Sequence, residues 1–103
     1  MIEQLELRSP QAHIALTCTV RRRSGAPIPV QTRDVGPRGM RIVSPRPLAL
    51  DETVGFDLPN LDMRVSGVAR VLRQERMNVY VLRFEGLPEP MTRRLHALAI
   101  TSR

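Results

Sequence analysis

Apolar and polar residues alternate along most of the chain. Between residues 12 and 20, every second residue from Ile14 onward is apolar, with Thr17 and Thr19 among the residues between them. A period of two is typical of a strand that places one face on a hydrophobic core. The alternation recurs along the chain and predicts six strands, at residues 12–20, 28–33, 40–43, 54–58, 63–72 and 79–84.

Prolines and glycines separate these segments. The nine prolines and six glycines are spaced closely enough to favour short strands over long helices. They predict loops at residues 34–39 and 44–50, and a polar connection is expected at residues 74–78. Gly67, inside the longest predicted strand, indicates a bulge or a bend.

The end of the chain has the spacing of a helix instead. Met91, Leu95 and Leu98 recur at helical intervals, and Pro90 suits a first helical turn. A helix this short is marginal alone, so it must dock on the sheet. The expected fold class is therefore mainly β, a six-stranded antiparallel β-barrel with a short C-terminal α-helix.

The length and composition are those of one globular domain. A chain of 103 residues with 42% hydrophobic residues can bury a core, and no linker divides it. Because it has only one tyrosine and two phenylalanines, aliphatic side chains must form most of that core. We expect a single domain with a flexible arm at residues 1–11, the barrel at residues 12–87 and the helix at residues 90–101.

The net charge is +6, and arginine supplies all the permanent positive side-chain charge, since the chain has no lysine. One interpretation is a solvated surface in a protein from a GC-rich genome. The other is anion recognition, because guanidinium groups form bidentate pairs with phosphate and stack on bases. Specific nucleic-acid recognition has little support, since no helix-turn-helix pattern is present and few aromatic side chains exist for base stacking.

No arrangement of residues in the sequence supports catalysis or metal binding. Cys18 is the single cysteine, and neither His13 nor His96 has a cysteine or carboxylate at ligand spacing. The acidic residues are scattered, and no glycine-rich phosphate-binding loop is followed by the required lysine. We therefore expect a binding module, not an enzyme, with neither a metal nor a cofactor.

No segment approaches the roughly 20 apolar residues that a membrane-spanning helix needs. The first ten residues carry acids and lack the apolar stretch of a signal peptide. We therefore expect a cytoplasmic protein without membrane insertion, which a single unpaired cysteine also fits.

One loop combines groups that suit a phosphate-bearing ligand. In this loop, at residues 34–39, Arg38 supplies a guanidinium group for phosphate or for a purine face, and Arg33 supplies another directly before it. Asp34 supplies a carboxylate that can accept from a guanine edge. Gly36 and Gly39 permit positive φ and leave the backbone accessible. The alternative is a plain hairpin in which Asp34 binds nearby backbone and the glycines serve the turn.

Residues 34–39 resemble the [D/N]xSxxG motif of the PilZ family, at the place in the strand order where that family carries it. The resemblance extends from about Arg8 to Ile100 and also covers residues 50–54, 67–71 and 80–85. It implies a bacterial signalling module with a six-stranded barrel and a C-terminal helix. It also implies cyclic di-GMP as the ligand, bound by this loop and by an RxxxR motif before the first strand.

The chain departs from both family motifs. Gly36 stands in place of the motif serine, so that hydroxyl is missing. Arg8 stands in place of the first arginine of RxxxR, but Ala12 replaces the second. Each lost charge-assisted hydrogen bond is worth about 1.5–3 kcal/mol. The run Arg21, Arg22 and Arg23 would supply auxiliary phosphate contacts if the N-terminal segment folds over the sheet.

Two functions remain open from the sequence. The first is a cyclic di-GMP receptor in which the ligand orders the N-terminal arm and the ordered surface meets a partner protein. The alternative is a degenerate PilZ-like module that no longer binds the ligand and acts by protein contact, with a surface around residues 79–87. In either case the chain acts as a monomer or a homodimer.

Overall fold

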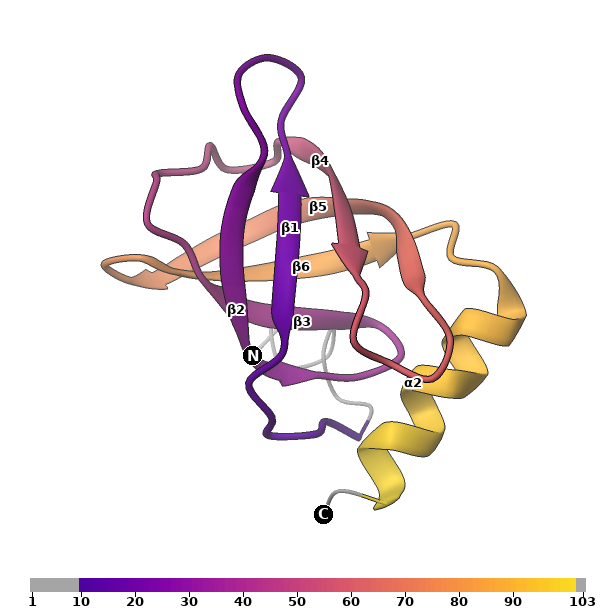
Figure 1. Ribbon diagram of the computed structural model, residues 1–103. Helices are drawn as coiled ribbons and strands as arrows, with labels where there is room; N and C mark the ends of the chain where they lie inside the picture. Colours follow the sequence, from indigo (N-terminus) through magenta and orange to yellow (C-terminus); the bar gives the residue numbers. More distant parts are fainter. Residues whose placement is uncertain (1–9, 102–103) are drawn as a thin grey trace.

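The computed structural model describes residues 10–101, in which six antiparallel strands close into a barrel and one helix lies against it (Figure 1). The predicted fold class is confirmed. The elements are β1 (Thr17–Arg21), β2 (Ile28–Val35), β3 (Gly39–Val43), β4 (Thr53–Leu58), β5 (Val65–Arg76), β6 (Val79–Glu85) and α2 (Glu89–Thr101). Around the barrel the strands follow the order β1, β2, β3, β6, β5, β4.

The first strand is shorter than its alternation predicts. Before β1 begins, Ala12 forms an isolated bridge to Val35, and the Leu16 carbonyl accepts from the Thr32 amide at 3.0 Å. The Thr32 hydroxyl accepts from the amide of Leu16 at 2.8 Å and donates to the carbonyl of Ile14 at 2.6 Å. The Thr32 side chain therefore holds residues 14–16 in place, where a regular backbone ladder was expected.

The fifth strand is longer than predicted, and its irregularities lie elsewhere. Residues 74–76, expected in a connection, belong to β5, and Asn78 makes the tight turn to β6 with a φ of 68°. The register between β5 and β6 shifts between Val71 and Arg73 and again near Arg76. Gly67 shows no bulge, because it pairs in regular register with Phe56.

The core is largely aliphatic, as the composition predicts, with one aromatic contact. Phe56 and Phe84 stack with ring centroids 4.7 Å apart, and Leu95 and Ala99 of α2 are fully buried. Cys18 is also fully buried, and that burial raises the pKa of its thiol to about 12. A thiol held in this protonated state is a packing residue and not a nucleophile.

The β6 strand is buried on both faces at its start. Residues 79–82 are each at most 5% exposed. The apolar partner surface expected around residues 79–87 is therefore not available there, because neighbouring side chains already cover these residues. Among residues 10–101, the large apolar side chains that are exposed lie elsewhere, namely Val43, Leu50, Met63, Val68, Met77 and Ile100.

No helix in the described part of the chain is long and apolar enough to cross a membrane.

Candidate functional site

The turn between β2 and β3 is a tight hairpin end. The Gly36 amide donates to the Gly39 carbonyl at 2.9 Å, which leaves Pro37 and Arg38 at the tip. The carbonyl of Arg38 accepts from the amide of Phe84 at 2.9 Å, so β6 holds the tip in place. The described glycines with positive φ are Gly25 and Gly86, so neither Gly36 nor Gly39 uses the positive φ that a glycine permits.

Gly36 is required for a close approach of the N-terminal segment. The amide of Ala12 donates to the carbonyl of Val35 at 2.7 Å, and the amide of Val35 donates back at 2.9 Å. A Cβ atom on Gly36 would lie 2.6 Å from Nε2 of Gln11 and closer still to the carbonyl oxygen of Pro10. Any side chain at position 36 would force this segment away.

Asp34 is buried although it faces outward from the barrel. A register shift after Thr32 places Asp34 opposite Arg41 of β3. The carboxylate is only 5% exposed, and its Oδ2 accepts from Nη1 of Arg41 at 2.9 Å. Its Oδ1 is buried and has no hydrogen-bond partner among the residues that the structure describes. The expected backbone bond of a plain hairpin is not what holds this side chain.

Arg41 links Asp34 to a second carboxylate. Its Nε donates to Glu75 at 2.8 Å, and Arg73 donates to the same carboxylate at 2.9 Å. The hydrogen bond from Arg41 is the main reason that the pKa of Glu75 is lowered, and the same bond raises the pKa of Arg41. The network fixes Arg41 and leaves one oxygen of Asp34 available to a donor.

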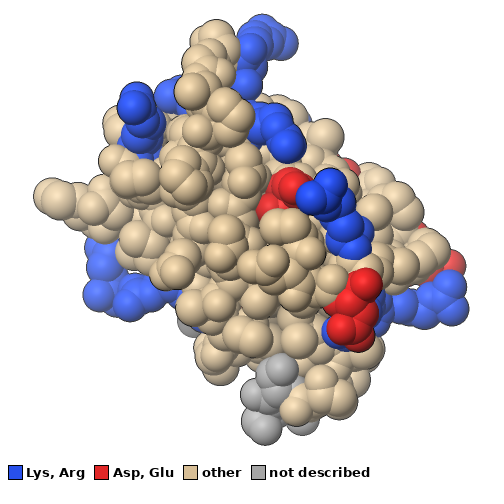
Figure 2. Space-filling view, viewed as in Figure 1, with Lys and Arg blue, Asp and Glu red and all other residues tan. Residues whose placement is uncertain are grey.

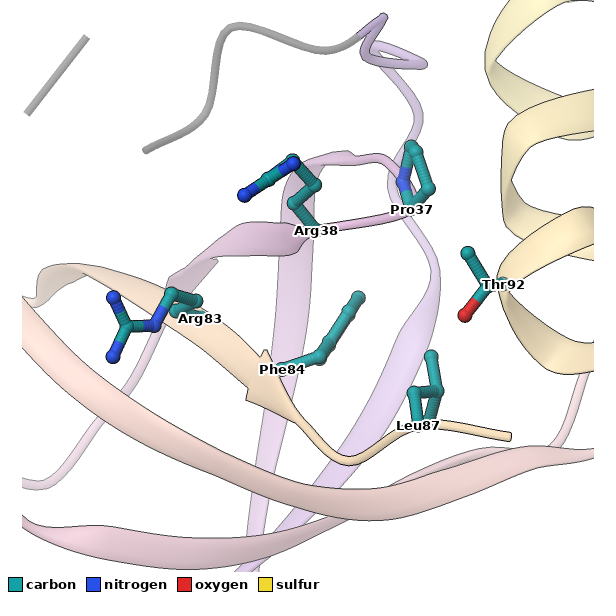
Figure 3. Close-up of a pocket in the computed structure, with 6 residues that line it drawn as sticks. All are labelled: Pro37, Arg38, Arg83, Phe84, Leu87 and Thr92. Atoms are coloured by element: carbon teal, nitrogen blue, oxygen red, sulfur yellow. The ribbon is translucent and has the colours of Figure 1, made fainter. Parts of the chain in front are cut away.

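A shallow hollow of about 190 Å³ adjoins the turn (Figure 3). Pro37 and Arg38 line it from the turn, Arg83 and Phe84 from β6, and Thr92 from α2. Its lining combines two guanidinium-bearing residues with an aromatic ring, which suits a planar anionic group.

The structure brings together some of the predicted ligand residues. Arg33, Asp34, Gly36, Arg38 and Gly39 lie along the end of β2, the turn and the start of β3, with both arginines exposed. Arg8 lies outside the described residues.

The arginine run at the end of β1 does not join this cluster. Arg21 ends β1, and β2 must run its eight residues from there before it reaches the turn, a span of roughly 20–25 Å. Nε of Arg22 pairs with Glu52 at 2.7 Å. The run therefore belongs to the opposite end of the barrel, at the β1–β2 hairpin (Figure 1), where several basic side chains gather (Figure 2).

Two residues of this site were not predicted from the sequence. Arg41 follows the inward-facing Met40 and stands opposite Asp34, so pairing the two strands across the turn would have revealed it. Gln11 has no comparable signal, because its position depends on how the N-terminal segment approaches Gly36. No group of three or more His, Cys, Asp or Glu residues that could hold a metal ion occurs in residues 10–101.

The ion pairs predict a loss of stability in acid. Hydrogen bonds from arginine lower the pKa of Glu75 and of Glu52 below the ordinary value of 4.5. Such pairs stabilise the fold fully above the ordinary value, and their contribution is lost as the pH falls through the lowered pKa. We expect the midpoint temperature of thermal unfolding, followed by circular dichroism, to decrease once the pH drops below about 4.5.

Two variants test the origin of this acid dependence. Glu75→Gln should flatten the decline, because it removes a carboxylate that titrates differently in the two states. Glu89→Gln is the matched control, since Glu89 makes no arginine ion pair within the part of the chain that is described. An unchanged acid profile in Glu75→Gln would contradict the assignment.

Comparison with known proteins agrees with this architecture. The family model described as the PilZ domain matches residues 6–100. No curated protein matches the chain. Among solved structures, the PilZ domain of CeSA from a cellulose-synthesizing bacterium is similar, with a TM-score of 0.69 and 14% sequence identity. The match covers 90% of this chain and 97% of that one, which at such low identity supports the fold alone.

Proposed function

Because the chain belongs to the PilZ domain family, we propose that it is a cytoplasmic regulatory module that binds cyclic di-GMP and relays its level to a partner protein. The observation that carries this proposal is Asp34. It is 5% exposed, it stands at the acidic position of the motif, and Oδ1 is buried without a partner among the described residues. A folded protein seldom leaves a buried carboxylate oxygen unpaired unless the site has a use for it.

Each residue of the turn has a role in the proposed complex. Oδ1 of Asp34 accepts from the N–H groups of a guanine edge. Arg38, at the exposed tip, pairs with phosphate or stacks on a purine, and Arg33 adds a second guanidinium. Gly36 and Gly39 place no side chain of their own between the hairpin backbone and the ligand, and Arg8 contributes from the arm. The hollow beside Arg38 receives part of a base or a phosphate.

Isothermal titration with cyclic di-GMP tests the proposal. We expect binding at micromolar concentration or tighter, weakened about tenfold by Arg38→Ala, because one charge-assisted contact is lost. Arg46→Ala is the matched control: Arg46 is an exposed arginine beyond the far end of β3, about a strand length from the turn, and its removal should leave affinity unchanged. If the protein releases no heat at any ligand concentration, or if the two variants lose affinity equally, the receptor function is wrong.

A second function is supported by the two departures from the family motifs. Ala12, in place of the second arginine, is fully buried in the core, and Gly36, in place of the serine, lies under Pro10 and Gln11. Both replacements are used in packing, as expected of a degenerate module that acts through protein contact alone. The absence of cyclic di-GMP binding in the titration above, with an intact fold, would favour this function.

A further inference from the structure

We propose that Gln11 is a built-in occupant of the ligand site, which cyclic di-GMP must displace in order to bind. This inference rests on the proposed receptor function. It concerns a residue at one of the variable positions of the RxxxR motif and predicts that the chain sets its own affinity through that side chain.

The position of Gln11 follows from backbone pairing. Since Ala12 and Val35 exchange both of their backbone hydrogen bonds, the antiparallel register places Gln11 opposite Gly36. The Pro10 carbonyl oxygen and the end of the Gln11 side chain then fill the space that a side chain at position 36 would take, with Nε2 of Gln11 2.6 Å and its Cδ 3.0 Å from the Cβ position. A serine at position 36 and the docked Gln11 are mutually exclusive.

The carboxamide of Gln11 makes no hydrogen bond where it lies against Gly36. Both Nε2 and Oε1 are buried without a partner among residues 10–101. A buried polar group without a partner is unfavourable, so the side chain does not hold itself in place. The segment is held instead by the two backbone bonds of Ala12 and by the full burial of its methyl group. Pro10 and Gln11 can therefore leave the space over Gly36 while Ala12 stays docked.

Asp34, near Gly36 in the chain, also has a buried polar atom without a partner. It precedes Gly36 by two residues at the end of β2, and its Oδ1 makes no hydrogen bond within the described chain. A ligand that donates to Oδ1 and occupies the space over Gly36 would satisfy the carboxylate and return the Gln11 carboxamide to water. Two unfavourable burials are relieved in one exchange, which gives the ligand a driving force for displacement.

Gln11→Ala tests the inference on the full chain by isothermal titration with cyclic di-GMP. Removing the occupant should tighten binding by roughly 5- to 150-fold, the range of typical couplings between linked equilibria. His13→Ala is the matched control, because His13 is an exposed residue of the same segment and should leave affinity unchanged.

Other outcomes separate this inference from the proposed function. If the parent binds and Gln11→Ala binds equally or more weakly, Gln11 is inert or contacts the ligand, and the inference is overturned while the receptor function stands. If neither protein binds, both are overturned. Gly36→Ser gives a test without ligand: the added side chain should unseat the segment and speed hydrogen exchange at the Ala12 amide. Unchanged exchange in that variant would contradict the exclusive fit.

Discussion

Asp34→Ala should weaken the binding of cyclic di-GMP by roughly 10- to 150-fold and change the free energy of unfolding by no more than about 1 kcal/mol. The loss of binding follows because the variant lacks the buried carboxylate that accepts from the ligand. Stability is preserved because the carboxylate is costly to bury with Oδ1 unpaired. Arg41 is not left without a partner, since it keeps its bond to Glu75 at 2.8 Å. Calorimetric titration and urea unfolding measure the two quantities separately.

Asp62→Ala is the matched control for this prediction. Asp62 also pairs with an arginine, Arg94 at 3.0 Å, but its side chain is 87% exposed and Asp62 lies far from the turn in sequence. Exposed ion pairs contribute little, so the variant should match the parent protein in both measurements. If Asp34→Ala instead unfolds much more easily and binds normally, Asp34 has a structural role and the carboxylate is not part of a ligand site.

The fold was predictable because its main signal is local. Alternating residues correctly indicated which side chains face the core, and this holds for Ile14 and Leu16, which pack against it outside any strand. The alternation does not report pairing, however. Whether a segment joins a ladder depends on its neighbours, and at residues 13–16 the Thr32 side chain takes that role. The prediction for the end of β5 was wrong for the opposite reason. Its residues are polar and resemble a loop, but they pair with β6.

The site was only partly predictable because its assembly is tertiary. The chemistry of residues 34–39 located the turn correctly between the second and third strands. The packing role of Gly36 could not be predicted. The sequence shows that a side chain is missing at this position but not that the N-terminal segment occupies the space. The prediction that Arg21–Arg23 lie beside the turn was wrong because it did not take the strand topology into account. A hairpin puts the end of β1 next to the start of β2, a full strand length from the end of β2.

Phe56→Ala should lower the free energy of unfolding by about 3–5 kcal/mol, the largest stability change expected in the chain. Phe56 is 1% exposed, and its ring stacks on Phe84 at an interplanar angle of 24°. The variant loses the buried apolar area, leaves a cavity and breaks the only aromatic pair found in the described core. In thermal unfolding the midpoint should fall by more than about 10 °C.

The same substitution reaches the candidate site through Phe84. That residue lines the hollow beside Arg38, and its amide holds the tip of the turn through the Arg38 carbonyl at 2.9 Å. Phe56→Leu, which restores most of the lost volume, should recover at least half of the stability, whereas ligand affinity should recover only in part because the ring stack stays broken. Met77→Ala is the control, since Met77 is 81% exposed; its free energy of unfolding should stay within about 0.5 kcal/mol of the parent value. If Phe56→Ala and Met77→Ala unfold at the same denaturant concentration, the barrel interior does not supply the stability on which the turn depends.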